Sequence, residues 1–130
     1  MKHYNVVAAV VCHNGKYLCM QKGKTKFEYT SYKWEFPGGK IEPGETPQQA
    51  LARELMEEME YPVEVGEELT TVTHEYPDFS ITMTAFLCTP KAEANGFKRK
   101  EHADSKWCCK KELQGLDWAA ADVGVVESIL

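Results

Sequence analysis

Runs of apolar residues divide the chain into short strands around one well-marked helix. Residues 6–12 are apolar and β-branched, which predicts a buried strand. The turn signal at residues 13–15 then leads into a returning strand over residues 16–21. Two further β-rich runs, residues 69–76 and 80–89, are joined by a short Pro-Asp-Phe connection and predict a second hairpin. Most of the predicted sheet therefore comes from two hairpins.

The segment between these hairpins carries the signals of an α-helix. Thr46 is a suitable N-cap, a proline follows it at the first helical position, and Gln49 completes a capping box. Leu51, Leu55 and Met59 recur at four-residue spacing and are expected to face the core. A Tyr-Pro pair shortly after Met59 ends the helix.

The rest of the chain completes an α/β pattern without repeats or linkers. We expect a polar loop over residues 22–31 and a short extended piece over residues 32–36. After the second hairpin we expect an irregular stretch over residues 92–100, a strand over residues 106–109 and a C-terminal helix over residues 119–130. These elements predict a mixed sheet flanked by helices, with the long helix on one face. The length of 130 residues suits a single domain with one core, residues 1–130.

Composition and charge narrow the class of protein. Fifteen basic and twenty acidic side chains give a formal charge of −5, which argues against binding to a nucleic-acid polymer. No run approaches the ~20 apolar residues that span a bilayer, and the start of the chain lacks the form of a signal peptide, so we expect a cytoplasmic protein. An odd number of cysteines without a CxxC pair predicts free thiols rather than disulfides or zinc; they are Cys12, Cys19, Cys88, Cys108 and Cys109.

Three acidic residues of the predicted helix lie on one face. Glu54, Glu57 and Glu58 have the spacing i, i+3 and i+4, and Arg53 precedes Glu57 by one turn. Spacing alone favours a solvated acidic face. The alternative is a site for a hard cation such as Mg²⁺ or Mn²⁺, because carboxylate oxygens suit these ions. The glycine turn before the helix shifts the balance toward this alternative, since glycines let a carbonyl or phosphate come close.

These residues together resemble the signature of a known family. The pattern Gly-x5-Glu-x7-Arg-Glu-U-x-Glu-Glu-x-Gly-U, where U is bulky and apolar, is the Nudix box, and the chain matches it in register at Gly39, Glu45, Arg53, Glu54, Leu55, Glu57 and Glu58. One position departs from it: Glu60 stands where the family has glycine. That glycine follows the helix, where a left-handed backbone is often needed, so we expect the substitution to affect the end of the helix more than catalysis.

The resemblance implies a fold and a reaction. It implies the Nudix α/β/α sandwich and the hydrolysis of a nucleoside triphosphate to a monophosphate and pyrophosphate, by attack of water on the β-phosphorus. Residues 34–42 and 75–82, and Lys100-Glu101 followed by Trp107, are similar to the MutT-like and CTP-pyrophosphohydrolase-like members. The implied ligands of Mg²⁺, for which Mn²⁺ could substitute, are the Gly39 carbonyl, Glu54, Glu57, Glu58 and Glu101. The implied general base is Glu54, with Glu101 as second choice.

The substrate-binding residues rest on the same resemblance. Phe36, Asp78 and Phe79 are expected to border or stack on the base, and Asp122 aligns with the residue that reads the base in MutT-like members. The alternative for Asp122 is a cap of the last helix. Among the lysines, those that could contact phosphate are Lys22, Lys24 and Lys40, although lysines of this kind are more often solvated surface residues.

The favoured function is the removal of damaged nucleotides, with 8-oxo-dGTP as substrate, in support of DNA replication and repair. A pyrophosphohydrolase for CTP, dCTP or modified cytosine nucleotides is the enzymatic alternative, and the neighbours Glu101 and His102 resemble that group. A catalytically silent nucleotide-sensing module is less favoured, because such modules usually lose the acidic residues of the box. We expect a monomer or homodimer.

Overall fold

Two long parallel strands form the centre of the sheet. The computed structural model describes residues 1–130, and in it β1, Lys2–His13, runs parallel to β6, Phe79–Pro90. On the far side of β6 lies β5, Val63–Glu75, which is antiparallel to it. On the far side of β1 lies the short β4, Gly38–Lys40, also antiparallel. The predicted second hairpin is therefore confirmed, with β5 beginning earlier than expected.

A second group of strands branches from the end of β1. Asn14 and Gly15 adopt positive φ angles of 52° and 74° in the turn that leads into β2, Lys16–Lys22, as the turn signal predicted. β2 pairs only briefly with β1 and then lies between β3, Trp34–Glu35, and β7, His102–Cys108. The strand predicted at residues 106–109 thus begins earlier, at His102.

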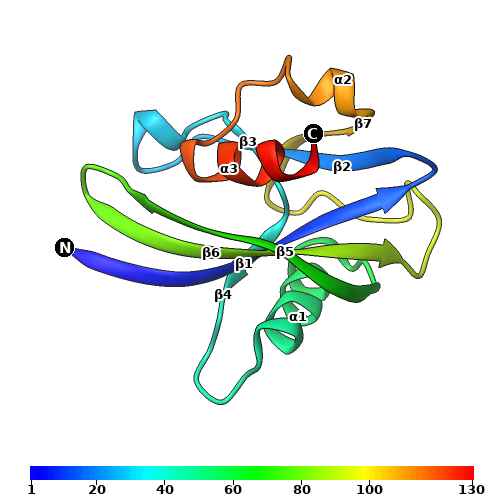
Figure 1. Cartoon of the computed structure of the whole chain (residues 1–130), viewed down its shortest axis with the longest axis horizontal. Helices are drawn as coiled ribbons and strands as arrows, with labels where there is room; N and C mark the ends of the chain where they lie inside the picture. Colours follow the sequence, from blue (N-terminus) through cyan, green and yellow to red (C-terminus); the bar gives the residue numbers. More distant parts are fainter.

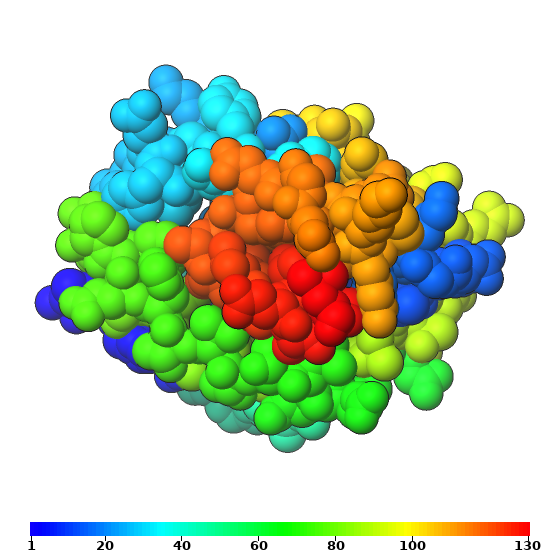
Figure 2. Space-filling model, turned by 45° about the horizontal axis from the view of Figure 1, so that its top comes forward, coloured from blue at the N-terminus to red at the C-terminus, as the bar shows by residue number.

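Helices cover both faces of the sheet (Figure 1). The helix α1, Pro47–Met59, lies below the sheet in this view, and α3, Ala120–Ile129, lies above it. A short helix α2, Lys110–Leu113, which the sequence analysis did not predict, lies beside β7. The predicted polar loop contains one 3₁₀ turn, η1, at Glu28–Thr30. Figure 2 shows α3, in red, at the surface, with the orange segment that precedes it on one side and green residues on the other.

The capping signals of α1 are confirmed. The Thr46 hydroxyl accepts a hydrogen bond from the Gln49 N–H at 3.1 Å, and the Gln49 side chain accepts one from the Thr46 N–H at 3.0 Å. Leu51, Leu55 and Met59 are fully buried. The helix therefore begins where the sequence specifies, and the burial of these three residues orients its acidic face away from the core.

The core is split by the sheet into two layers, because side chains alternate along each strand. Val7 of β1 packs on the α1 side, whereas Ala8 packs on the α3 side. All five cysteines are free, as predicted, and three of them are buried. None of the helices has both the length and the apolar character needed to cross a membrane.

Candidate active site

Arg53 organises the acidic face of α1. Its Nε and Nη2 atoms donate to the two carboxylate oxygens of Glu45 at 2.6 and 2.9 Å, and its Nη1 donates to Glu54 at 3.0 Å and to Glu57 at 3.1 Å. Nη2 also donates to the Lys40 carbonyl at 3.0 Å. A planar guanidinium can make several such bonds in fixed directions. Arg53 therefore joins the helix to the loop before it, beyond the single contact with Glu57 that spacing predicted.

The absence of a side chain at Gly39 lets Glu54 reach the sheet. A Cβ atom at Gly39 would overlap the carboxyl group of Glu54. Only 14% of the Glu54 side chain is exposed, compared with 59% for Glu57. The Glu54 carboxylate thus lies against the backbone of β4, so the glycine turn and the acidic face of the helix meet at this point.

Glu58 lies in a strongly negative environment. Burial, followed by the negative charges of Glu54, Glu101 and Glu35, raises the pKa of Glu58 to about 8. These carboxylates come from three separate parts of the chain. Arg53 and Lys22 pair with Glu54 and Glu35, whereas no basic side chain forms an ion pair with Glu58 or Glu101. An oxygen-rich, negatively charged set of this kind fits a hard divalent cation.

The acids are not arranged as a finished metal site. No three His, Cys, Asp or Glu side chains converge as they stand. Arg53 holds the carboxylates of Glu54 and Glu57, so two acids of this face are already paired with a cation.

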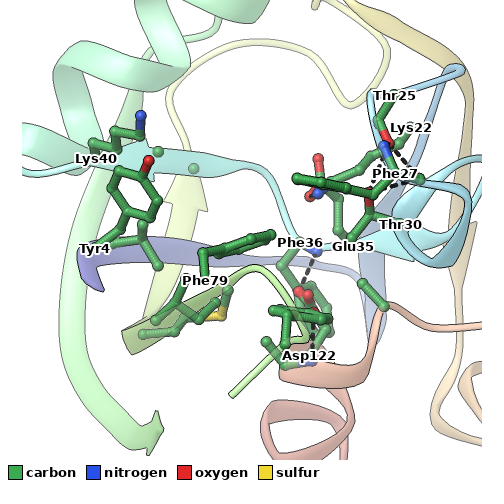
Figure 3. Close-up of a pocket in the computed structure, with 18 of the residues that line it drawn as sticks. Tyr4, Lys22, Thr25, Phe27, Thr30, Glu35, Phe36, Lys40, Phe79 and Asp122 are labelled. Carbon is green, nitrogen blue, oxygen red and sulfur yellow. Dashed lines mark hydrogen bonds and ion pairs between the residues drawn. The ribbon is translucent and has the colours of Figure 1, made fainter. Parts of the chain in front are cut away.

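A cavity of about 970 Å³ lies next to these acids, which is at the upper end of the range for small-molecule sites. Figure 3 shows Lys40 and Tyr4 on one side, Lys22 and Glu35 on the other, and Asp122 between them. The predicted site residues that line it are Lys22, Lys24, Phe36, Gly39, Lys40, Glu58, Asp78, Phe79, Glu101 and Asp122. A smaller adjoining cavity is lined by Gly39, Lys40, Glu54 and Glu58, whereas Arg53 and Glu57 line neither.

Glu35 and His102 belong to the site but were not among the predicted residues. Glu35 lies 3.4 Å from the Lys22 ammonium and 3.0 Å from His102 Nε2. The His102 ring is almost fully buried, and its Nδ1 has no hydrogen-bond partner. Glu35 directly precedes the predicted Phe36 and lines the same cavity, and His102 directly follows the predicted Glu101. The only sequence signal for Glu35 and His102 was that each stands next to a predicted site residue.

Asp122 is a buried acid at the base of the cavity. Its Oδ1 accepts a hydrogen bond from the backbone N–H of Phe36 at 3.0 Å, and only 2% of the residue is exposed. The alternative that it caps the last helix is wrong, because the N-cap of α3 is Ala119 and no side chain bonds there. Burial, together with the negative charge of Glu35, raises the pKa of Asp122 to about 8.

Aromatic rings form one wall of the cavity. Phe79 stacks on Tyr76 with centroids 4.9 Å apart and on Phe27 at 5.7 Å. Asp78 accepts a hydrogen bond of 2.8 Å from the Tyr29 hydroxyl, so its carboxylate is already engaged. Phe36 is 2% exposed and stacks on Trp118 rather than projecting freely. Phe79 thus lines the cavity as part of an aromatic cluster, and Phe36 lines it as a buried residue of the supporting wall.

The cavity also carries positive charge. The lysines that line it are Lys2, Lys22, Lys24, Lys26 and Lys40. The Lys40 ammonium lies 4.2 Å from the centre of the Tyr4 ring, a cation–π contact that fixes its direction. One cavity therefore combines an aromatic wall, lysines at its rim, a buried acid and a group of carboxylates at one end. This is the combination that a base, a phosphate chain and a divalent cation would need.

Comparison with known proteins gives a consistent result. A family model described as NUDIX domain matches residues 1–128. The chain is 42% identical to an 8-oxo-dGTP diphosphatase of Proteus vulgaris over 68% of this chain and 78% of that protein. It is 33% identical to a CTP pyrophosphohydrolase of Escherichia coli K12 over 100% of this chain and 93% of that protein.

A solved structure of similar sequence has the same fold. The solution structure of the E. coli ORF135 protein superposes with a TM-score of 0.82 at 32% identity, covering 99% of this chain and 89% of that one. The predicted α/β/α sandwich is confirmed by this likeness and by the helices on both faces of the sheet.

Proposed function

The chain belongs to the Nudix hydrolase family, and we propose that it hydrolyses a nucleoside triphosphate to a nucleoside monophosphate and pyrophosphate with the help of Mg²⁺. One observation carries this proposal. The acids around Glu58 lie at one end of a cavity whose rim carries Lys22 and Lys40 and whose floor carries Asp122. A nucleotide could therefore extend from a base subsite to a metal-binding end in a single cavity.

Each acid has a role in this proposal. The Gly39 carbonyl and the carboxylates of Glu54, Glu57, Glu58 and Glu101 would hold Mg²⁺, or Mn²⁺ in its place. When bound, such an ion neutralises charge on the phosphates and lowers the pKa of an attacking water. Glu54 is our first choice for the general base, since its carboxylate is the more enclosed one and is oriented by Arg53. Glu101 is the second choice.

The substrate we favour is 8-oxo-dGTP, which would make the chain an enzyme that removes oxidised nucleotides before they enter DNA. The 42% identical relative from P. vulgaris carries this activity in its name. The aromatic wall around Phe79 supports stacking on a purine or a pyrimidine equally well. Lys22 and Lys40 would contact the phosphates or the groups that hold them.

A pyrophosphohydrolase for CTP, dCTP or a modified cytosine nucleotide is the second candidate. The observation that favours it is the match to the E. coli CTP pyrophosphohydrolase along the entire chain. The buried Asp122 fits either base, because each presents an N–H donor beside an acceptor: the amino group beside N3 in cytosine, and N7–H beside O6 in oxidised guanine. The two candidates share the reaction and differ in the base.

Product analysis tests the proposed reaction. We expect that normal and oxidised nucleoside triphosphates, hydrolysed in oxygen-18 water, yield monophosphate and pyrophosphate, with the label in pyrophosphate. This follows from attack at the β-phosphorus. Mass spectrometry of the products provides the measurement, and the substrate with the highest kcat/KM identifies the base. Release of inorganic phosphate and a diphosphate would contradict the reaction, and no turnover of any triphosphate would favour the silent nucleotide-sensing module.

Replacement of Asp122 tests base reading. With a pKa of about 8, Asp122 is mostly protonated at pH 7, so one oxygen can donate while the other accepts from Phe36. Asp122→Asn keeps a donor and an acceptor and is expected to retain the ranking of substrates. Asp122→Ala leaves hydrogen-bonding atoms of the base unpaired. It should reduce the discrimination between triphosphates with different bases roughly 5- to 150-fold, which corresponds to a loss of about 1–3 kcal/mol in binding free energy.

The same residue predicts a dependence on pH. Because the protonated form is lost above about pH 8, discrimination by the wild-type enzyme should weaken there, while that of Asp122→Asn should not. The measurement is kcat/KM for two competing triphosphates between pH 6 and 9. An unchanged ranking in Asp122→Ala would show that the base is read elsewhere.

A further inference from the structure

The residue that ends α1 has an unusual backbone conformation. Glu60 is the C-cap of the helix and adopts the left-handed conformation, with φ 49° and ψ 41°. Glycine accepts this conformation without strain, whereas a residue with a Cβ does not. Glu60 occupies the position where the Nudix pattern has glycine, so the chain retains the geometry of the glycine but carries an acidic side chain there.

That side chain binds the segment which precedes β7. The Glu60 carboxylate lies 2.8 Å from the Lys100 ammonium and 3.4 Å from the Lys98 ammonium. The backbone N–H of Lys98 also donates to the Met59 carbonyl at 2.8 Å. The last turn of α1 is thus joined to residues 98–100 by two ion pairs and a backbone hydrogen bond.

Glu101 lies between this attachment and a second one. On its N-terminal side Lys100 is paired with Glu60, and on its C-terminal side His102 is paired with Glu35 at 3.0 Å. Glu101 itself forms no ion pair with a basic side chain, and it lines the same cavity as Glu58; its charge is also among the causes that raise the pKa of Glu58. The segment is held on both sides while its central carboxylate is left free toward Glu58.

We propose that Glu60 is a positioning residue that holds Glu101 next to Glu58 for cation binding, an inference that rests on the proposed role of Glu101 as a ligand. Each ion pair of Glu60 is partly exposed and contributes little to the free energy of unfolding. Its effect is on where Lys100, and therefore Glu101, lies. The acidic substitution thus adds to the site a contact that glycine could not make.

The test measures Mn²⁺ binding to the full chain without nucleotide, by the electron paramagnetic resonance signal of free Mn²⁺, together with unfolding in urea. Glu60→Gly is expected to weaken Mn²⁺ binding roughly three- to tenfold, as the loss of two partly exposed ion pairs implies. Its resistance to urea should stay the same or rise, because glycine relieves the left-handed strain. A merely structural role would instead lower resistance to urea.

Lys100→Gln distinguishes a positioning role of Glu60 from a simple electrostatic effect of its charge on the cation. This variant removes a positive charge, so long-range electrostatics alone would strengthen Mn²⁺ binding, whereas loss of the attachment weakens it. We expect weakening. Glu67→Gln is the charge-matched control for Glu60, since Glu67 is exposed on β5 and outside both cavities. It should leave Mn²⁺ binding and urea resistance unchanged.

A double variant decides whether Glu60 acts through Glu101. In the Glu101→Gln background, Glu60→Gly should cause no further weakening. The inference is overturned if Glu60→Gly binds Mn²⁺ as the wild type does, if Lys100→Gln strengthens binding, or if Glu60→Gly remains harmful without Glu101. If Glu101→Gln alone has no effect on Mn²⁺ binding, the ligand role of Glu101 fails first and the inference with it, while product analysis still tests the reaction independently.

Discussion

Glu58→Gln is expected to lower kcat by roughly 10²–10⁴-fold and, in the absence of metal, to raise the free energy of unfolding. The carboxylate is the most strongly perturbed acid of the cluster, with a pKa raised to about 8 by burial and by Glu54, Glu101 and Glu35. The amide keeps the shape but is a far poorer ligand for a hard cation. Loss of activity and gain of stability thus have the same origin.

The sign of the stability change follows from the pKa. The folded-state pKa of Glu58, about 8, lies above its ordinary value of 4.5, so the folded protein binds the proton more tightly than the unfolded chain. The free energy of unfolding therefore falls as pH rises through this interval. At pH 8 the Gln variant should be more stable by roughly 1–3 kcal/mol, after allowance for solvent screening of a group that is not fully buried.

Glu57→Gln provides the comparison. Glu57 is 59% exposed and bonded to Arg53, so its replacement should lower kcat without a comparable gain in stability. The measurements are steady-state kinetics with saturating Mg²⁺ and urea unfolding in chelator, at pH 6 and pH 8. Wild-type turnover in both variants would exclude the proposed ligand set, and a less stable Glu58→Gln would contradict the origin assigned to its pKa.

Removal of divalent cations is expected to abolish turnover, by at least about 10³-fold, with recovery on addition of Mg²⁺ or Mn²⁺. Arg53 is the strongest cationic partner of the acidic face, and it is already shared among Glu45, Glu54 and Glu57. Glu58 forms no ion pair with a basic side chain, so we expect the ion to supply the positive charge at that end of the cavity.

The same experiment has a readout in stability. In chelator the free energy of unfolding should fall between pH 6 and pH 8, because Glu58 and Asp122 both lose protons that the fold retains more tightly than the unfolded chain. Mg²⁺ should reduce this slope through its effect on Glu58. Titration of activity and of the unfolding midpoint with Mg²⁺ provides the measurement, and full turnover in excess chelator would contradict the mechanism.

Local signals predicted the acidic helix in detail. The N-cap at Thr46, the capping box with Gln49 and the buried positions of Leu51 and Leu55 all depend on residues within one or two turns of each other. The same holds for the turn at Asn14, where the dipeptide itself specifies positive φ angles. Chemistry that depends on one helix face, such as the grouping of Glu54 with Glu58, could therefore be inferred from spacing.

Contacts between distant segments could not be inferred in this way. His102 meets Glu35 across 67 positions of the sequence, and Asp122 meets the Phe36 N–H across 86. The first contact arises because β2 places β3 on one side and β7 on the other. The second arises because the backbone of Trp34 bonds to Asp117 and Ala119, just before α3. No local pattern encodes either arrangement. Only the resemblance to the family suggested Asp122. It did not indicate that the carboxylate accepts a hydrogen bond from the Phe36 N–H.

The parallel pairing of β1 with β6 has a consequence for how the chain folds. Lys2 lies opposite Phe79 and Val11 lies opposite Cys88, so this ladder joins residues 77 positions apart. Closing so long a loop costs conformational entropy before any contact compensates for it, and it slows folding relative to a fold built from neighbouring strands. During synthesis β1 can pair early only with β2 and β4, and its longest ladder cannot form until β6 has been made. The β5–β6 hairpin, whose partners are close in sequence, can form first and serve as the template on which β1 docks.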